Sequence, residues 1–364
     1  MARTSTLNPE PIRWVVLAPV IAVIVSVTPI PAWIVDDFYS RDMYMWLQHV
    51  MTTATNILPF ALLDLLLIGM ITSVLFRAYR LVQVTKQRGI MDALWEAFRR
   101  TVRAVSILAI LFLWGWGFNY RRVPLHETLA GGVPAKPTVE MLTVALSDAA
   151  ALAMRLRPVA QPEGRLHSIA LDLREPMNAA LRSLNREPLQ TPSRPKTSLV
   201  LSPFFNWAGI TGMMNPLGHE SILLPDLLPY ERPFVLAHEW AHLAGHADEA
   251  EASAIGWLAC MKGSPTLGYS ASLYLIMETA DALPESARDP VLKRLDAGVR
   301  TDLDAIFARM RKQRPTVQRT ASRVYDEYLR ANRVADGTAS YGRALQLILS
   351  PTFRDALSSY TITK

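Results

Sequence analysis

The sequence is poor in cysteine and in charge. Cys260 is the only cysteine among the 364 residues, which excludes an internal disulfide framework, and its apolar surroundings predict a buried thiol. Charged residues make up 19% of the chain and hydrophobic residues 50%, with a mean hydropathy of +0.15. A soluble enzyme seldom needs so apolar a chain, so we expect membrane-spanning segments. No internal repeat or low-complexity tract stands out.

The longest apolar stretches lie in the first third of the chain. Crossing a bilayer takes about twenty helical residues, and we predict three transmembrane helices, over about 14–35, 57–78 and 103–120. A cleaved signal peptide is the competing interpretation of the first stretch, but its apolar run is long for one and no clear cleavage site follows. Asp64 is the one charge in the apolar part of the second stretch, and we expect it to be satisfied between packed helices.

The basic residues orient these helices. Few acids balance the basic residues between the second and third stretches, which are Arg77, Arg80, Lys86, Arg88, Arg99, Arg100 and Arg103. By the positive-inside rule this loop is cytoplasmic, and everything after Tyr120 lies on the outer side. Topology and anionic lipid headgroups then explain most of the net charge of +6, and we expect no binding of nucleic acid.

The chain divides into a membrane region and an outer domain. Residues 1–123 form the predicted membrane region, and the Gly- and Pro-rich residues 124–137 form a linker. Residues 138–364 form the predicted extracytoplasmic domain.

Within that domain the hydrophobic pattern is mostly helical. Amphipathic helices are predicted over Thr138–Pro158 and Leu166–Arg186, and helical periodicity returns after Lys262. Two short runs favour β-strands, Thr197–Leu201 and Ser221–Leu224. The predicted fold class is therefore α-rich α+β, a mainly helical domain with a small sheet.

A potential metal-binding motif lies in PFVLAHEWAHLAGHADEAEAS, from Pro233 to Ser253. In a helix, His238 and His242 lie one turn apart on one face, where two neutral imidazoles suit tetrahedral Zn²⁺. Glu239, beside the first histidine, can reach a water molecule at the metal and take its proton. We therefore predict a zinc site in which Glu239 is the general base of a hydrolase.

A catalytic zinc site needs a third protein ligand, and three carboxylates follow the motif. Continuing to Asp248 gives H-E-x-x-H-x-x-G-x-x-D, a variant of the metzincin spacing. Glu249 begins E-x-x-A-S, which resembles the second helix of gluzincin-type membrane peptidases, and a turn at Gly245 would bring that helix back to the first. We expect Glu249 to be the ligand, with Glu251 and Asp248 as alternatives, and Ser253 to hydrogen-bond a liganding histidine.

Other segments could support hydrolysis. Candidates for stabilising an oxyanion are His219, Tyr230, His246 and Tyr341. In zinc peptidases a strand before the motif helix commonly binds the substrate backbone at the sheet edge, and Ser221–Leu224 is placed to do so.

Several segments together resemble a family of uncharacterised bacterial membrane proteins, a domain of unknown function whose members are suspected zinc peptidases. The similarity runs from Ser202 to about Ser350, through FNWAGITGMMNPLGHESILLP, the motif segment and YDEYLRANRVADGTASYG, and it includes the three N-terminal spans. The resemblance implies a zincin-like, gluzincin-type domain anchored in the bacterial cytoplasmic membrane, with both motif histidines and Glu249 on the metal. It also draws attention to Glu220 and Tyr341.

The sequence thus predicts a membrane-anchored zinc metallopeptidase whose partners are the lipid bilayer and a peptide or protein substrate. Two alternatives stay open: a zinc-containing membrane receptor or scaffold without proteolytic turnover, and a structural membrane protein in which the motif is fortuitous. Glu239 favours the enzyme, because a purely structural metal site does not need a base.

Overall fold

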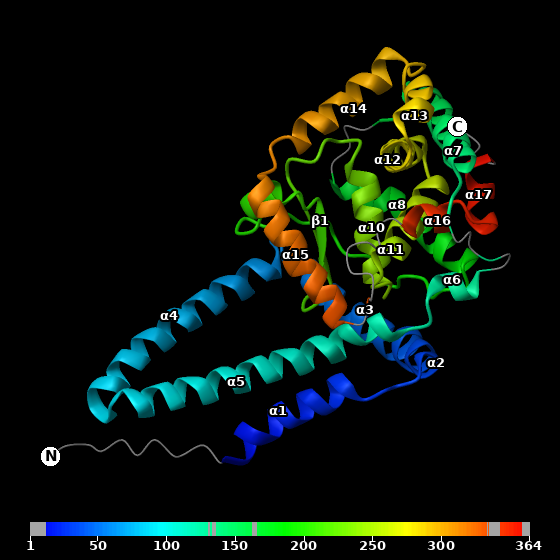
Figure 1. The fold of residues 1–364 in the computed structure, drawn as a ribbon. Coiled ribbons are helices and arrows are strands. Elements are labelled where there is room, and N and C mark those ends of the chain that lie inside the picture. The colour runs from blue at the N-terminus through cyan, green and yellow to red at the C-terminus, as the bar shows by residue number, and fades with distance from the viewer. Residues whose placement is uncertain are drawn as a thin grey trace.

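The computed structural model describes residues 12–129, 136–161, 166–332 and 343–358, together with residues 132 and 334. Helices make up most of this described part, and one two-stranded sheet accompanies them, which agrees with the predicted mostly helical class (Figure 1). The thiol of Cys260 is buried, as its apolar surroundings predict.

Three helices form an arm that projects from the rest of the molecule. α4 (Leu62–Arg88) and α5 (Ile90–Gly115) meet at Gly89, where a φ of 90° permits the sharp reversal, and α1 (Ile12–Val27) runs beside α5 (Figure 1). The basic segment that we expected to be a loop is therefore helical on both sides of Gly89, and it forms the far part of the arm.

The three predicted membrane spans differ in whether they form a helix of spanning length. Among the described residues, α4 is the one helix that is long and apolar enough to cross a membrane by itself. A second candidate is a pair of segments, Leu17–Val27 and Ala32–Asn56, which are bent by 108° relative to each other. The stretch over 103–120 ends in a break after Gly115, and charged residues as far as Arg103 occupy the first half of α5, so the helix is not apolar over a full bilayer thickness.

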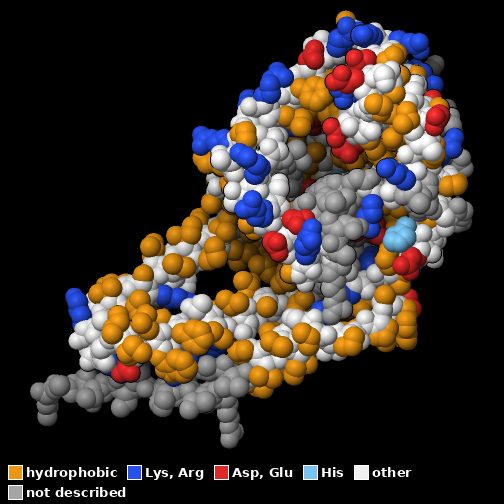
Figure 2. Space-filling model, in the orientation of Figure 1, with side chains coloured by type: hydrophobic (Ala, Val, Ile, Leu, Met, Phe, Trp, Pro, Cys, Tyr) orange, Lys and Arg blue, Asp and Glu red, His pale blue; other side chains and the backbone are white. Residues whose placement is uncertain are grey.

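The arm exposes apolar side chains along its length (Figure 2). The apolar window of α4 is only 6% buried, and Val74, Leu75 and Phe76 are among its exposed residues. Exposed apolar surface of this extent is typical of a protein that contacts lipid or another protein.

The chain folds back into the domain between α1 and α4, and again after α5. The first of these segments forms α2 (Ala32–Ile34), the π-helix η1 (Val35–Met43) and α3 (Tyr44–Asn56). The second forms the 3₁₀-helix η2 (Gly117–Arg121) and α6 (Leu125–Thr128). Tyr44, Trp116 and Leu125 are buried in the same apolar core as the helices of the domain. The hydrophobic core therefore includes residues on both sides of the predicted linker at 124–137.

The remaining helices pack around the motif helix. They are α7 (Val139–Leu156), α8 (Leu166–Ser183), α9 (Ser202–Ala208), α10 (Arg232–Leu243), α11 (Glu249–Met261), α12 (Pro265–Ala282), α13 (Glu285–Leu292), α14 (Ala297–Met310), α15 (Pro315–Ala331), α16 (Ala344–Ile348) and α17 (Pro351–Ser358). α10 and α11 lie side by side at the centre, and α8 and α12 pack against both of them.

The sheet pairs β1 (Gly212–Asn215) with β2 (Glu220–Leu223) in antiparallel register. The prediction of a strand over Ser221–Leu224 is thus right within one residue. On the far side of β2, Lys196 makes an isolated parallel bridge to Ile222. The second expected strand, Thr197–Leu201, is wrong: its last residues form a turn that leads directly into α9, because Asp64 binds the backbone N–H groups of this segment.

Candidate metal centre

A tight connection between α10 and α11 brings the two motif segments together. Gly245 adopts a φ of 84°, which permits the reversal after α10. Asp248 then caps α11, because its carboxylate accepts hydrogen bonds of 2.9 and 3.2 Å from two backbone N–H groups in the first turn. This turn leaves Glu249 at the first position of α11.

Gly256 allows α11 to lie directly against α10. A Cβ atom at this position would come within 2.8 Å of the backbone nitrogen of His238. Only glycine permits this approach, which sets the distance between the histidines on one helix and Glu249 on the other.

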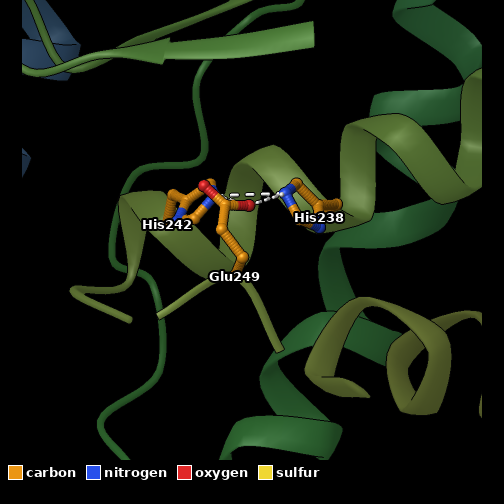
Figure 3. A group of neighbouring side chains, drawn as sticks. All are labelled: His238, His242 and Glu249. Atoms are coloured by element: carbon orange, nitrogen blue, oxygen red, sulfur yellow. Dashed lines mark hydrogen bonds and ion pairs between the residues drawn. The ribbon is translucent and has the colours of Figure 1, made fainter. Parts of the chain in front are cut away.

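The ligand atoms of His238, His242 and Glu249 form a small triangle (Figure 3). The two Nε2 atoms lie 3.1 Å apart, and Oε2 of Glu249 lies 3.2 Å from the first and 3.4 Å from the second. Zinc bonds of about 2.0–2.2 Å in a tetrahedron place neighbouring ligand atoms about 3.3–3.6 Å apart. The three side chains therefore fit three corners of a tetrahedral zinc site.

Both imidazoles are oriented by contacts of their other ring nitrogen. Nδ1 of His242 donates to the carbonyl oxygen of His246 at 2.7 Å, and the hydroxyl of Ser253 lies 3.2 Å from Nδ1 of His238. Such contacts hold the rings with Nε2 towards the metal position.

Burial and mutual charge act in opposite directions at this triangle. Burial works to raise the pKa of Glu249, but the imidazoles of His242 and His238 outweigh it and hold the pKa well below its usual value. The carboxylate is thus ionised, as a metal ligand must be.

Glu239 lies beside the triangle and is almost fully buried, at 3% exposure. Burial raises its pKa to about 8, and His242 and a hydrogen bond from the backbone N–H of Met214 offset this only in part. Oε2 of Glu239 has no hydrogen-bond partner among the described residues. Strand β1 passes so close that a Cβ on Gly212 would fall 2.5 Å from Oε1. The carboxyl group is thus held between α10 and β1 with one oxygen unused.

The other two carboxylates point away from the triangle. Oδ2 of Asp248 accepts from Arg343 at 2.7 Å while Oδ1 caps α11. Glu251 accepts from the backbone N–H of Leu125 at 2.6 Å and lies 3.0 Å from Nδ1 of His246. Glu249 is the one of the three candidates that the structure brings to the histidines.

The remaining predicted residues have partners elsewhere. His219 lies 3.1 Å from the carbonyl oxygen of Gly115, and Tyr230 donates to the carbonyl oxygen of Asp302 at 3.1 Å. Glu220 accepts from the backbone N–H groups of Leu62 and Leu63 and so caps α4. His246 contacts Glu251 as described, and Tyr341 lies outside the described residues. None of the described candidates is placed to serve as an oxyanion donor by these contacts.

Comparison with known proteins identifies the family. A family model described as "Protein of unknown function (DUF3810)" matches residues 39–349, which includes the motif and most of the arm. The chain belongs to the DUF3810 family. No curated protein and no solved structure shows significant similarity to this chain.

In this DUF3810 chain a tyrosine that sequence reasoning missed contacts the candidate ligand. The hydroxyl of Tyr325 on α15 donates to Oε1 of Glu249, and its ring stacks on Tyr328 at 5.8 Å between centroids. Tyr325 opens the segment YDEYLRANRVADGTASYG, in which only Tyr341 had been singled out. The i, i+3 spacing of two tyrosines on an amphipathic helix was the available signal, and it is too common to single out a site.

A buried charge network of the DUF3810 chain connects the segments next to the arm helices to the candidate metal centre. Asp36 in η1 accepts hydrogen bonds from Arg122 at 2.9 Å and from Arg186 at 3.1 Å. Arg122 also donates to the carbonyl oxygen of Gly245 at 3.0 Å, in the turn after α10. Because this turn precedes the carbonyl group that orients His242, the chain following the arm supports the position of a candidate ligand.

Proposed function

We propose that this DUF3810 protein is a membrane-anchored zinc metallopeptidase in which His238, His242 and Glu249 hold the metal. The triangle of ligand atoms carries this proposal, because two imidazole nitrogens and one carboxylate oxygen are a donor set of catalytic zinc that leaves a fourth position open. Zinc, when bound, would polarise the scissile carbonyl and activate a water molecule.

Glu239 moves the proton in this proposal. Its buried Oε2, which lacks a partner among the described residues, accepts the proton of the attacking water and passes it to the leaving amine. A receptor or scaffold with a purely structural metal would not need this carboxyl, so the enzyme is favoured over that alternative.

The edge of β1 that faces away from β2 provides a place for the substrate backbone at Gly212 and Met213, which are half-buried, whereas Met214 and Asn215 are buried. We had assigned this role to Ser221–Leu224, but β2 has β1 on one side and the bridge from Lys196 on the other. β1 pairs on one side only among the described residues, and Glu239 lies against it at Gly212 and Met214. A peptide added to this edge would therefore pass the base.

The membrane arrangement belongs to the same proposal. We place α1, α4 and α5 across the bacterial cytoplasmic membrane, with the tip of the arm in the cytoplasm and the domain outside. Exposed apolar side chains along the arm and basic residues towards its tip support this orientation (Figure 2).

Zinc content and peptide hydrolysis, measured together on purified full-length protein, test the proposal. Wild type is expected to hold one zinc ion per chain and to cleave a mixed peptide library. Glu239→Gln keeps the shape of the side chain and should retain zinc while losing at least about 10²-fold of the cleavage rate. His238→Ala should lose both. Absence of zinc from the wild type, or cleavage that survives Glu239→Gln, would contradict the proposal, and zinc without any cleavage would favour the receptor.

A further inference from the structure

The candidate metal centre lies directly on the end of the arm. The ring of His242 packs edge-on against Trp116, the residue that follows α5, with centroids 6.4 Å apart. The first residue of α3 also contacts the end of α10, because the hydroxyl of Tyr44 donates to the carbonyl oxygen of Leu243 at 3.0 Å. The candidate metal position therefore lies close to the domain-side end of α5.

The β-hairpin connects this centre to both long helices. Its turn ends at Glu220, which binds the first N–H groups of α4 at 3.0 and 2.9 Å, while His219 lies 3.1 Å from the last carbonyl group of α5. β1 therefore runs from Gly212, which lies against Glu239, towards the domain-side ends of α4 and α5 at Asn215. The three steps of this strand cover about 10 Å.

We propose that the substrate is a membrane-tethered polypeptide that is cut within a few residues of the outer membrane surface. This inference rests on the peptidase function and the membrane arrangement proposed above. A chain that leaves the bilayer beside α4 and α5 passes the buried residues Met214 and Asn215 and reaches the unpaired edge of β1 at Gly212, beside Glu239. About three or four extended residues cover this distance. A folded soluble protein would have to bring its cleavage site down to the lipid surface to reach the same place.

The direction of β1 also determines which end of the substrate is anchored. β1 runs towards the membrane ends of the helices, and antiparallel pairing is the more stable mode of strand addition. An antiparallel substrate strand runs away from the membrane, so the anchor precedes the scissile bond in its sequence.

The test uses the full-length, zinc-loaded protein in liposomes and synthetic peptides that share one randomised ten-residue stretch. In the first set a transmembrane helix directly precedes the randomised stretch. In the second set a twenty-residue Gly/Ser spacer separates the transmembrane helix from that stretch. In the third set the transmembrane helix follows the randomised stretch, and the fourth set has no transmembrane helix. Mass spectrometry gives the position of each cut. The first set should be cut at least about tenfold faster than the second, which has the same surface concentration, and its cuts should cluster about three to five residues from the anchor.

Each result decides the inference. Equal rates for the first two sets, cuts spread evenly along the randomised stretch, or faster cleavage of the unanchored peptides would overturn it and leave the peptidase function intact. Preferred cleavage of the third set would overturn the direction. No cleavage of any peptide by the zinc-loaded wild type, or cleavage that Glu239→Gln does not reduce, would overturn the peptidase function itself.

Discussion

The hydroxyl of Tyr325 donates a hydrogen bond to Oε1 of Glu249, although 76 residues separate them in the chain. Removing this donor should weaken metal binding, because a partner that orients a liganding carboxylate is typically worth about 10- to 100-fold in affinity. We expect Tyr325→Phe to raise the dissociation constant of zinc about tenfold in competition with a chromophoric chelator. Tyr328→Phe is the matched control: its hydroxyl contacts Tyr120 instead, and its zinc affinity should stay within about twofold of wild type. Wild-type affinity in Tyr325→Phe would show that the contact does not support the metal.

Gly256 tests whether close packing of α10 and α11 maintains the site. In Gly256→Ala the new Cβ would meet the backbone of His238 at 2.8 Å, and such overpacking costs about 1–3 kcal/mol of unfolding free energy. Both the melting temperature in detergent and the zinc content should fall. In Gly69→Ala on α4 no heavy atom lies within 4 Å of the added Cβ. This control should lower neither the melting temperature nor the zinc content. Unchanged zinc binding in Gly256→Ala would show that the two helices can separate without loss of the site.

Substitution of Asp36 tests how strongly the buried charges stabilise the domain beside the arm. Asp36→Asn leaves Arg122 and Arg186 buried without their carboxylate, and loss of one partner of a buried pair costs about 3–5 kcal/mol. We expect a lower melting temperature in detergent. Asp37→Asn alters the neighbouring carboxylate, which is 61% exposed, and should be nearly neutral. Equal melting temperatures for the two variants would be inconsistent with this role of Asp36.

We expect the buried His219 to make the unfolding free energy depend on pH. Burial lowers the pKa of this histidine to about 4, below the usual value of 6.5. Between pH 6.5 and 4 the unfolded chain binds a proton that the folded chain does not, so the unfolding free energy falls as the pH is lowered through this window, by up to about 3 kcal/mol. Because Asn also tolerates the positive φ of 47°, His219→Asn should show a shallower fall in melting temperature from pH 7 to pH 4.5. Parallel pH profiles would rule out His219 as the source.

The membrane orientation can be tested with single cysteines, since Cys260 is buried and should give little background labelling. Ser147→Cys lies on the exposed side of α7, and Gln87→Cys lies near the tip of the arm. An impermeant maleimide added to spheroplasts should label the first site, and it should label the second only after the membrane is permeabilised. The reverse pattern would place the domain in the cytoplasm.

Local features of the candidate centre could be predicted from the sequence. The spacing of His238 and His242 places them on one face of any helix, and Gly245 predicts a turn after which a second helix follows. Glu249 is the preferred third ligand because of this turn and of the E-x-x-A-S pattern, and its oxygen is the one that lies with the two imidazoles. The short strand before α10 was also found within one residue.

Contacts between distant segments could not be predicted in this way. Glu220 was a candidate for the reaction, but the start of α4 lies within reach of its carboxylate and makes it a helix cap. The position of Lys196 beside β2 could not be predicted either, because its bridge to Ile222 joins segments about 25 residues apart in the chain.

The sequence by itself determined the H-E-x-x-H motif, the helical character of the chain and the apolar character of the arm helices, because each depends on residues that are close along the chain. Only the tertiary structure decided that Tyr325 contacts Glu249, that Arg122 links Asp36 to the turn after α10, and that His242 of the candidate centre packs against Trp116. These contacts join residues more than seventy positions apart, and hydrophobic periodicity carries no information about which distant faces pack together.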